Sequence, residues 1–152
     1  MTNFIKQHLP EEVKVIIVGQ DPNDAGATGL AFSKDVGAGI YQSTAIILEE
    51  VRNDIGENNL RPFPRDYGNL DYWAKQGVLL LNSALTKPTN KDESHANLGW
   101  DEIVGELIKR LQQINKNIII MFWGLLAREL SEYVELYDQN QLLFAGLPTM
   151  NN

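Results

Sequence analysis

Two kinds of hydrophobic pattern alternate along this 152-residue chain. Continuous apolar runs rich in Ile, Val and Leu predict strands buried on both faces, whereas apolar residues at three- and four-residue spacing predict amphipathic helices. Strands that alternate with helices are typical of βαβ units, so the pattern predicts a parallel sheet. The predicted strands are 13–19, 78–81, 118–123 and 142–145, and the predicted helices are 40–55, 70–75, 101–114 and 125–137.

Local signals place the ends of the first long helix and the loop that follows it. Ser43 and Thr44 are the candidate N-cap residues, and Gly56 is a natural stop signal. The segment 58–69 holds two prolines and predicts a loop. Because no repeat or low-complexity tract divides the chain, we expect a single domain over residues 1–152.

The composition excludes several kinds of site. The chain has no cysteine, which rules out thiol catalysis, zinc-cysteine sites and iron-sulfur clusters and fits a reducing compartment. Residues 1–6 lack the apolar core of a signal peptide, and no apolar run approaches the length of a membrane span. We therefore expect a soluble cytoplasmic protein, associated with the nucleoid or, if viral, in the host cytoplasm, with no membrane partner.

The charge balance argues against a broad basic face. Thirteen Lys and Arg against twenty Asp and Glu give a net charge of −7, the wrong sign for extended contact with nucleic acid. A local basic rim is still compatible with this balance, and ordinary solvated side chains are the alternative reading. The candidates for such a rim are Lys34, Lys87, Lys91 and Arg128.

Polar residues follow the predicted strands at the edge where open α/β sheets bind ligands. Asp21 follows the first strand and presents a carboxylate, while Asn82 follows the second and offers both a donor and an acceptor to a planar ligand such as a pyrimidine. Taken singly, each has a structural explanation: a turn or helix cap for Asp21, an Asx-turn for Asn82, the core for Phe32 and a loop hydrogen bond for His95.

Five motifs, in order, resemble family 1 uracil-DNA glycosylases from about residue 13 to residue 124. They are Gly-Gln-Asp-Pro (19–22), Gly-Leu-Ala-Phe-Ser (29–33), Trp-Ala-Lys-Gln-Gly-Val-Leu-Leu-Leu-Asn-Ser-Ala-Leu-Thr (73–86), Ser-His-Ala-Asn-Leu-Gly-Trp (94–100) and Phe-Trp-Gly (122–124). The resemblance implies a three-layer αβα fold around a central four-stranded, twisted parallel sheet. It also implies an enzyme that flips a uracil nucleotide out of DNA and hydrolyses its N-glycosidic bond, with no metal and no organic cofactor.

The resemblance also implies roles for individual residues. Asp21 is the catalytic carboxylate that orients water and stabilises the positively charged sugar, and Asn82 reads the uracil edge. Phe32 stacks on the flipped base, and the main chain of Gln20 closes the pocket floor. The candidate DNA contacts are Ser43, Ser83 and His95.

Two positions depart from the family's pattern. Asn23 stands where the family has the Tyr that excludes the 5-methyl group of thymine, so the pocket is open to 5-substituted uracils or is collapsed. Leu147 aligns with the His that stabilises the departing uracil anion, and the family's His-Pro-Ser-Pro-Leu loop is missing. Loss of such a donor costs about 10²–10³ in rate in other enzymes. Met150 is a candidate wedge into the base stack.

Two hypotheses from different classes follow. The first is a compact glycosylase acting on uracil or a 5-substituted uracil in DNA, with altered or reduced activity and single strands as a candidate preference. Backbone N–H groups or His95 would then replace part of the missing leaving-group stabilisation. The second is a catalytically impaired relative that serves as a DNA- or protein-binding module, with a protein partner as a further candidate.

Overall fold

A single four-stranded sheet organises the molecule. The computed structural model describes residues 9–23, 26–59, 64, 66–88, 95–135 and 137–149. All strand pairs are parallel, and the strands lie in the order β2-β1-β3-β4. This confirms the predicted parallel sheet, whose strands are β1 (Val15–Gly19), β2 (Val78–Asn82), β3 (Ile119–Trp123) and β4 (Leu142–Ala145).

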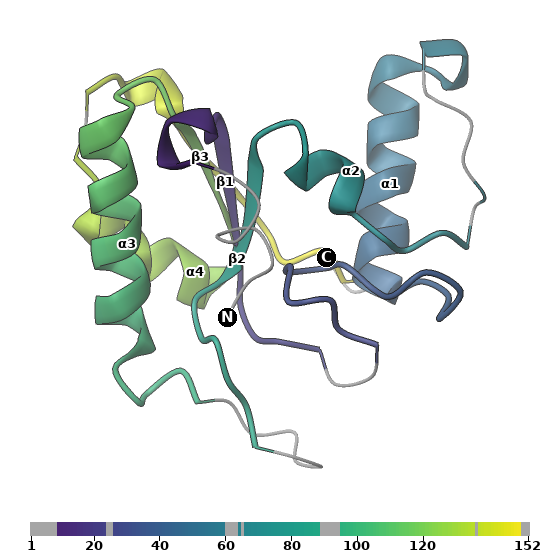
Figure 1. Cartoon of the computed structure of the whole chain (residues 1–152), viewed down its shortest axis with the longest axis horizontal. Coiled ribbons are helices and arrows are strands. Elements are labelled where there is room, and N and C mark those ends of the chain that lie inside the picture. Colours follow the sequence, from purple (N-terminus) through teal and green to yellow (C-terminus); the bar gives the residue numbers. More distant parts are fainter. Residues whose placement is uncertain are drawn as a thin grey trace.

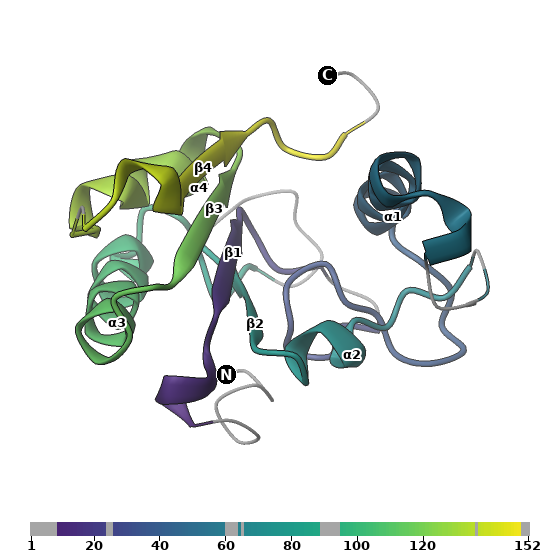
Figure 2. The same ribbon diagram turned by 90° about the horizontal axis from the view of Figure 1, so that it is seen from above.

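Helices cover both faces of the sheet. Figures 1 and 2 show α3 and α4 on one side of the strands and α1 and α2 on the other, which is the predicted three-layer αβα arrangement. Within the described residues, none of the helices is both long and apolar enough to cross a bilayer. The α-helices are α1 (Gln42–Ile55), α2 (Asp71–Ala74), α3 (Trp100–Ile114) and α4 (Leu125–Glu129).

The two faces of the sheet are covered to different degrees. We call the side toward α3 and α4 the closed face and the side toward α1 and α2 the open face. On the closed face the strand residues are at most 1% exposed, namely Ile16, Val18, Leu79, Leu81, Ile120 and Phe122. On the open face, Val15, Val78, Met121 and Trp123 are only half-buried, whereas Ile17 and Leu80 on the two central positions are buried.

The start of α1 differs from the prediction. The helix is preceded by Tyr41, whose side chain makes no capping hydrogen bond, so neither Ser43 nor Thr44 is the N-cap. Thr44 is fully buried, and its hydroxyl donates to the main-chain oxygen of Phe32. The predicted stop is confirmed, because the N–H of Gly56 closes the helix on the oxygen of Arg52 at 2.9 Å.

The last helix is shorter than the predicted 125–137. The α-helix α4 ends at Glu129, and the chain continues as a 3₁₀ turn, η3 (Leu130–Tyr133). Beyond it, the buried amide of Gln112 pairs with both main-chain groups of Glu135, at 3.1 and 3.2 Å. This long-range pairing holds the chain extended there. The other 3₁₀ turns are η1 (Pro10–Glu12), η2 (Glu57–Asn59) and η4 (Gln139–Gln141).

Candidate active site

The carboxyl ends of all four strands meet at one edge of the sheet. Gly19 of β1 lies beside Asn82 of β2, and Trp123 of β3 lies beside Ala145 of β4. The segment from Gln20 to Asn23 leaves β1 at this edge. The strand-end residues singled out from the sequence therefore lie along the ligand-binding edge of the fold, as expected.

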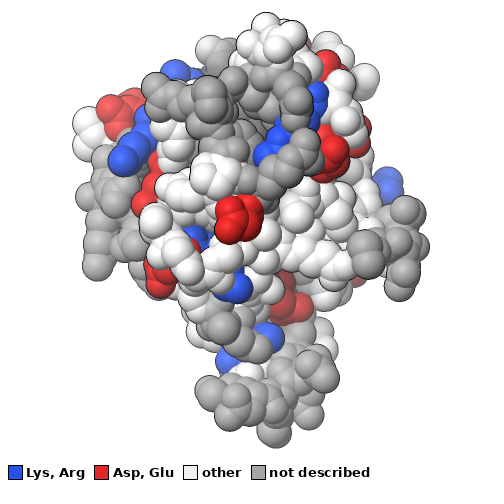
Figure 3. Space-filling view, turned by 90° about the vertical axis from the view of Figure 1, so that its right-hand side faces the viewer, with Lys and Arg blue, Asp and Glu red and all other residues white. Residues whose placement is uncertain are grey.

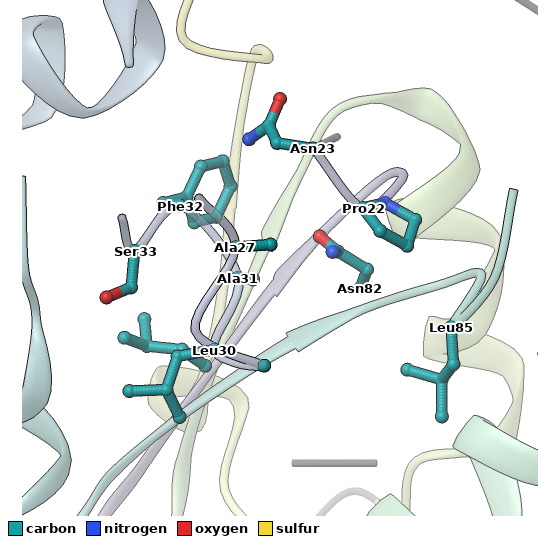
Figure 4. A pocket seen from close by; sticks show the side chains of 11 residues that line it. Pro22, Asn23, Ala27, Leu30, Ala31, Phe32, Ser33, Asn82 and Leu85 are labelled. Atoms are coloured by element: carbon teal, nitrogen blue, oxygen red, sulfur yellow. The ribbon is translucent and has the colours of Figure 1, made fainter. Parts of the chain in front are cut away.

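A pocket of about 90 Å³ opens at this edge beside β1 and β2. Figure 4 shows the Phe32 ring on one side, the Asn82 amide near the centre, Pro22 on the opposite side, and Asn23 above them. The pocket thus combines one aromatic face with one amide, the pair of groups that a planar base requires. Its remaining walls are Ala27, Gly29, Leu30, Ala31, Ser33, Leu80 and Leu85.

Gly19 allows the aromatic ring and the amide to lie together. A Cβ atom at this position would lie 2.5 Å from Cζ of Phe32 and 2.8 Å from Oδ1 of Asn82. Real Cβ atoms do not approach heavy atoms so closely, so any larger residue would displace one of the two side chains. The space that a side chain of β1 would take on the open face is filled by the ring and the amide.

Phe32 adopts an unusual backbone conformation. Its φ of 64° is the only positive value among the described residues other than glycine, and such a conformation costs of order 1–3 kcal/mol. The carbonyl of Phe32 accepts from the buried hydroxyl of Thr44 on α1. Phe32 is 7% exposed, and the centroid of its ring lies 5.4 Å from that of Trp123, with the two rings tilted by 54°.

The next two residues are fixed as well. The N–H of Leu70 donates to the hydroxyl of Ser33 at 3.0 Å, and the N–H of Lys34 donates to the oxygen of Gly68 at 2.9 Å. The segment before α2 therefore holds the chain directly after Phe32. Together with Thr44, these bonds keep the ring in the pocket wall.

The loop between β1 and Phe32 forms the mouth of the pocket. It closes on itself through an antiparallel bridge between Ala27 and Lys34, and the N–H of Ala31 donates to the oxygen of Leu80 at 3.3 Å. Asn23 and Ala27 are both exposed and line the pocket. Small or short side chains thus border the mouth, which leaves open space beside a bound base.

Gln20 is held by its main chain. Its oxygen accepts from the hydroxyl of Ser83 at 3.0 Å and from the N–H of Ala84 at 3.1 Å. Ser83 is 5% exposed, and its hydroxyl is already bonded to Gln20. Contact of Ser83 with DNA stays a prediction. The side chain of Gln20 lines a neighbouring hollow rather than the pocket around Phe32.

The other predicted residues lie at or beyond the rim. Asp21 is half-buried and immediately precedes Pro22 of the pocket wall. Ser43 is half-buried in the first turn of α1. Neither Ser43 nor His95 lines the pocket, and Asp24 and Met150 lie outside the described residues.

His95 belongs to a small polar cluster. Its Nδ1 lies 2.8 Å from the hydroxyl oxygen of Thr86, which also accepts from Nε1 of Trp100 at 2.9 Å. The Thr86 hydroxyl therefore joins the imidazole of His95 to the indole of Trp100.

Leu147 lies across the edge from this cluster. Its side-chain atoms would lie 3.4 and 3.5 Å from a Cβ atom at Gly124, so the leucine packs against the end of β3. A leucine side chain offers no hydrogen-bond donor to a leaving group. In the described ranges, no group of three or more His, Cys, Asp or Glu residues is placed to hold a metal ion.

Sequence reasoning missed Thr44 as a contact of Phe32, and it missed the steric role of Gly19. Thr44 was considered only as a helix cap, and nothing in the sequence links it to a residue twelve positions away. For Gly19 the signal was present, because a glycine ends the apolar run 15–18 directly before Gln-Asp-Pro.

The chain matches the family model "Uracil DNA glycosylase superfamily" over residues 6–147. It is 37% identical to uracil-DNA glycosylase 1 of Bacteroides fragilis over 141 residues, covering 91% of this chain and 61% of the relative. It is 39% identical to the uracil-DNA glycosylase of Campylobacter fetus, covering 91% of this chain and 58% of that relative. The chain thus spans about 60% of the length of these curated relatives.

The chain is also similar in structure to solved uracil-DNA glycosylases. The crystal structure of mimivirus uracil-DNA glycosylase is 27% identical and superposes with a TM-score of 0.77, covering 98% of this chain and 54% of the other. A variant of mimivirus UNG in complex with UGI superposes with a TM-score of 0.84 at 27% identity, covering 98% of this chain and 55% of the other.

Proposed function

The chain belongs to the uracil-DNA glycosylase superfamily, and from this premise we propose that it removes uracil from DNA by hydrolysing the N-glycosidic bond. The observation that carries the proposal is the meeting of Phe32 and Asn82 over Gly19 in a pocket at the sheet edge. A ring and an amide in this arrangement suit a flipped pyrimidine, which enzymes of this type take out of the base stack.

Asn82 supplies the discrimination. Its amide N–H donates to O4 of uracil and its amide oxygen accepts from N3–H, whereas cytosine presents the reversed pattern. Each buried polar group left unpaired by cytosine costs about 1–3 kcal/mol. Phe32 stacks on the base, and its backbone contact with Thr44 keeps the ring in place.

Asp21 supplies the electrostatic part of the reaction. As the bond between C1′ and the base breaks, positive charge develops on the sugar, and the carboxylate of Asp21, the residue before Pro22 of the pocket wall, faces that charge in the proposed mechanism. It also orients the water that adds to C1′, so that the products are an abasic site and free uracil. A carboxylate that meets charge formed only in the transition state raises kcat rather than ground-state affinity.

The departing uracil anion receives less help in this chain. The Leu147 side chain packs on Gly124 and provides no donor, so we expect slow excision in which His95 or backbone N–H groups take part of that role. The same observation favours the second candidate function, a catalytically impaired module that binds DNA or a protein. One mimivirus neighbour was solved in complex with UGI, which supports considering a protein partner.

The side chains at the pocket mouth determine which bases the pocket accepts. Asn23 and Ala27 border it with short side chains, so we propose that uracils carrying a 5-substituent are accepted beside uracil itself. Ser43, Ser83 and His95 remain proposed DNA contacts, with single strands as the proposed preference. A single domain over residues 1–152 and a cytoplasmic location belong to the same proposal.

Alkaline cleavage of oligonucleotides tests the activity. Uracil-containing single strands and duplexes are incubated with the protein, and abasic sites are then cleaved with alkali. We expect strand scission that falls by about 10²–10³ in Asp21→Asn, because the variant lacks the charge that opposes the sugar cation. Asp54→Asn, an exposed change at the far end of α1, is the matched control.

Three outcomes are informative. Scission lost in Asp21→Asn but kept in Asp54→Asn supports the enzyme. The absence of scission with uracil, thymine and 5-hydroxymethyluracil, even at stoichiometric protein, refutes it and leaves the binding module. Scission that is equal in both variants refutes the role of Asp21.

A further inference from the structure

The residues at the carboxyl ends of β1, β2 and β3 form one row across the open face. Gly19 pairs with Asn82 of β2, and the parallel register of β1 with β3 brings Trp123 to its other side. Successive side chains of a strand point to opposite faces, so these three positions share the open face. Gly19 contributes no side chain, and the Phe32 ring fills its place in the row.

Trp123 is the aromatic neighbour of Phe32 in this row. The two ring centroids lie 5.4 Å apart and the ring planes are tilted by 54°, which is within the range that aromatic pairs prefer. On its other side, the Phe32 ring lies beside the Asn82 amide above Gly19. The Phe32 ring is therefore confined between the amide that is proposed to read the base and the indole of Trp123.

A hollow of about 370 Å³ lies on the side of Trp123 that faces α1, and we call it the open-face hollow. Val51 of α1 and Met121 of β3 line it, and among the described residues Glu50 is the only charged one on its walls. Phe32 lines the base pocket and not the open-face hollow, whereas Trp123 lines the hollow and not the base pocket. The two rings thus separate these spaces.

The backbone conformation of Phe32 needs support from its surroundings. Its φ of 64° is unfavourable for a residue with a Cβ atom. Thr44 holds the carbonyl of Phe32, but a bond to the main chain does not restrict rotation about the Cα–Cβ bond. Packing restricts that rotation, and on the side away from Asn82 the packing comes from Trp123. Without the indole, the ring is free to turn into the open-face hollow.

The surface on this side of the molecule offers no broad electrostatic contact to nucleic acid. Figure 3 shows Lys and Arg interspersed with Asp and Glu on the side that α1 covers, with no continuous basic band among the described residues there. Phosphate contacts are the usual source of sequence-independent affinity for nucleic acid. Where they are few, binding of a flipped base depends more strongly on the pocket walls and on a fixed Phe32 ring.

We propose that Trp123 is a positioning residue for the stacking ring. It separates the base pocket from the open-face hollow and holds Phe32 at the angle at which uracil stacks on it. Trp123 is not among the residues that line the base pocket, so it acts on the base through Phe32. The inference rests on the proposed function, because uracil is the ligand proposed for this pocket.

Calorimetric titration of the whole chain with free uracil tests this role. We expect Trp123→Ala to weaken uracil binding about tenfold, because the Phe32 ring then turns into the hollow and stacking is lost. Trp123→Phe keeps an aromatic ring against Phe32 and should retain the affinity within about threefold. Val51→Ala is the matched control, since it enlarges the same hollow from α1 and keeps Trp123, and it should leave the affinity unchanged.

A double-variant cycle shows whether Trp123 acts through Phe32. Phe32→Ala alone should weaken uracil binding about tenfold or more, because the stacking face is gone. Adding Trp123→Ala to Phe32→Ala should cause no further loss, since residues that act through one contact are not additive. Urea unfolding of the same samples shows that each variant is folded. If Trp123→Ala does not fold, Trp123→Leu, which keeps most of the apolar volume but no ring, replaces it with the same expectation.

The outcomes separate this inference from the proposed activity. Equal uracil affinities of wild type and folded Trp123→Ala, an equal loss in Val51→Ala, or a further loss when Trp123→Ala is added to Phe32→Ala would overturn the role of Trp123. Wild-type protein that binds uracil with the expected pattern but gives no strand scission after alkali would refute the glycosylase and leave the role of Trp123 standing. Wild-type protein that binds no uracil would refute both.

Discussion

The two faces of the sheet use the same strands for different purposes. On the closed face, the central residues Ile120 and Phe122 have no exposed surface, and they lie on the side of the sheet that α3 and α4 cover. On the open face, Met121 and Trp123 are half-buried, and an apolar hollow of about 370 Å³ separates them from α1. Neighbouring positions of β3 thus lie in a sealed core and in a partly open layer.

The difference shows where the fold leaves room for a ligand. The pocket around Phe32 and Asn82 lies on the open face, where Gly19 contributes no side chain. Tight packing on the closed face fixes the positions of the strands, and the open face supplies the space. Changes on the closed face should therefore reduce stability, and changes on the open face should reduce ligand binding.

The largest expected effect compares adjacent residues of β3. Ile120→Ala should lower the free energy of unfolding by about 2–5 kcal/mol, because it leaves a cavity in a sealed layer. Met121→Ala should lower it by only about 1 kcal/mol, since that side chain is half-buried beside an existing hollow. Urea unfolding followed by circular dichroism measures both, and equal losses would contradict the distinction between the faces.

A second comparison uses two glycines that have no space for a methyl group. Gly19→Ala should weaken uracil binding about tenfold or more, because the new Cβ atom displaces Phe32 or Asn82. Gly105→Ala on α3, whose Cβ atom would meet the ring of Tyr133, should reduce stability by about 1–3 kcal/mol and leave the affinity unchanged.

Calorimetric titration with free uracil and thermal unfolding of the same samples measure both properties. If Gly105→Ala lost uracil affinity to the same extent as Gly19→Ala while remaining folded, the pocket would not depend on the contact at Gly19.

The smallest expected effect concerns the hydroxyl that holds Phe32. Thr44→Val leaves a buried carbonyl without its donor, which costs about 1–3 kcal/mol of stability, and Phe32 is then free to leave its positive-φ conformation. We expect uracil affinity to fall by about threefold to tenfold. The near-ultraviolet circular dichroism of Trp123, whose ring lies 5.4 Å from that of Phe32, should change as well.

Thr44→Ser keeps the donor and should restore both the affinity and the spectrum. A valine variant that loses stability but keeps the spectrum and the affinity would show that Thr44 supports the helix and not the ring.

Much of the fold follows from local pattern. The four strands and the long helix α3 were predicted within about two residues, because their apolar periodicity is continuous and agrees with their final burial. The errors lie where distant contacts decide. The chain after Glu129 left the α-helix because Gln112 pairs with Glu135, and Thr44 caps no helix because its hydroxyl reaches Phe32.

The sequence by itself determined the parallel sheet, its ligand-binding edge and the family, since apolar periodicity and consecutive motifs are written in neighbouring residues. Only the tertiary structure decided which of the candidate residues meet. It brought Phe32, Asn82 and Asn23 around one pocket, left Ser43 and His95 outside it, and placed Arg128 on Phe144. These relations depend on side chains that approach across the sheet from distant positions, and no local pattern encodes such contacts.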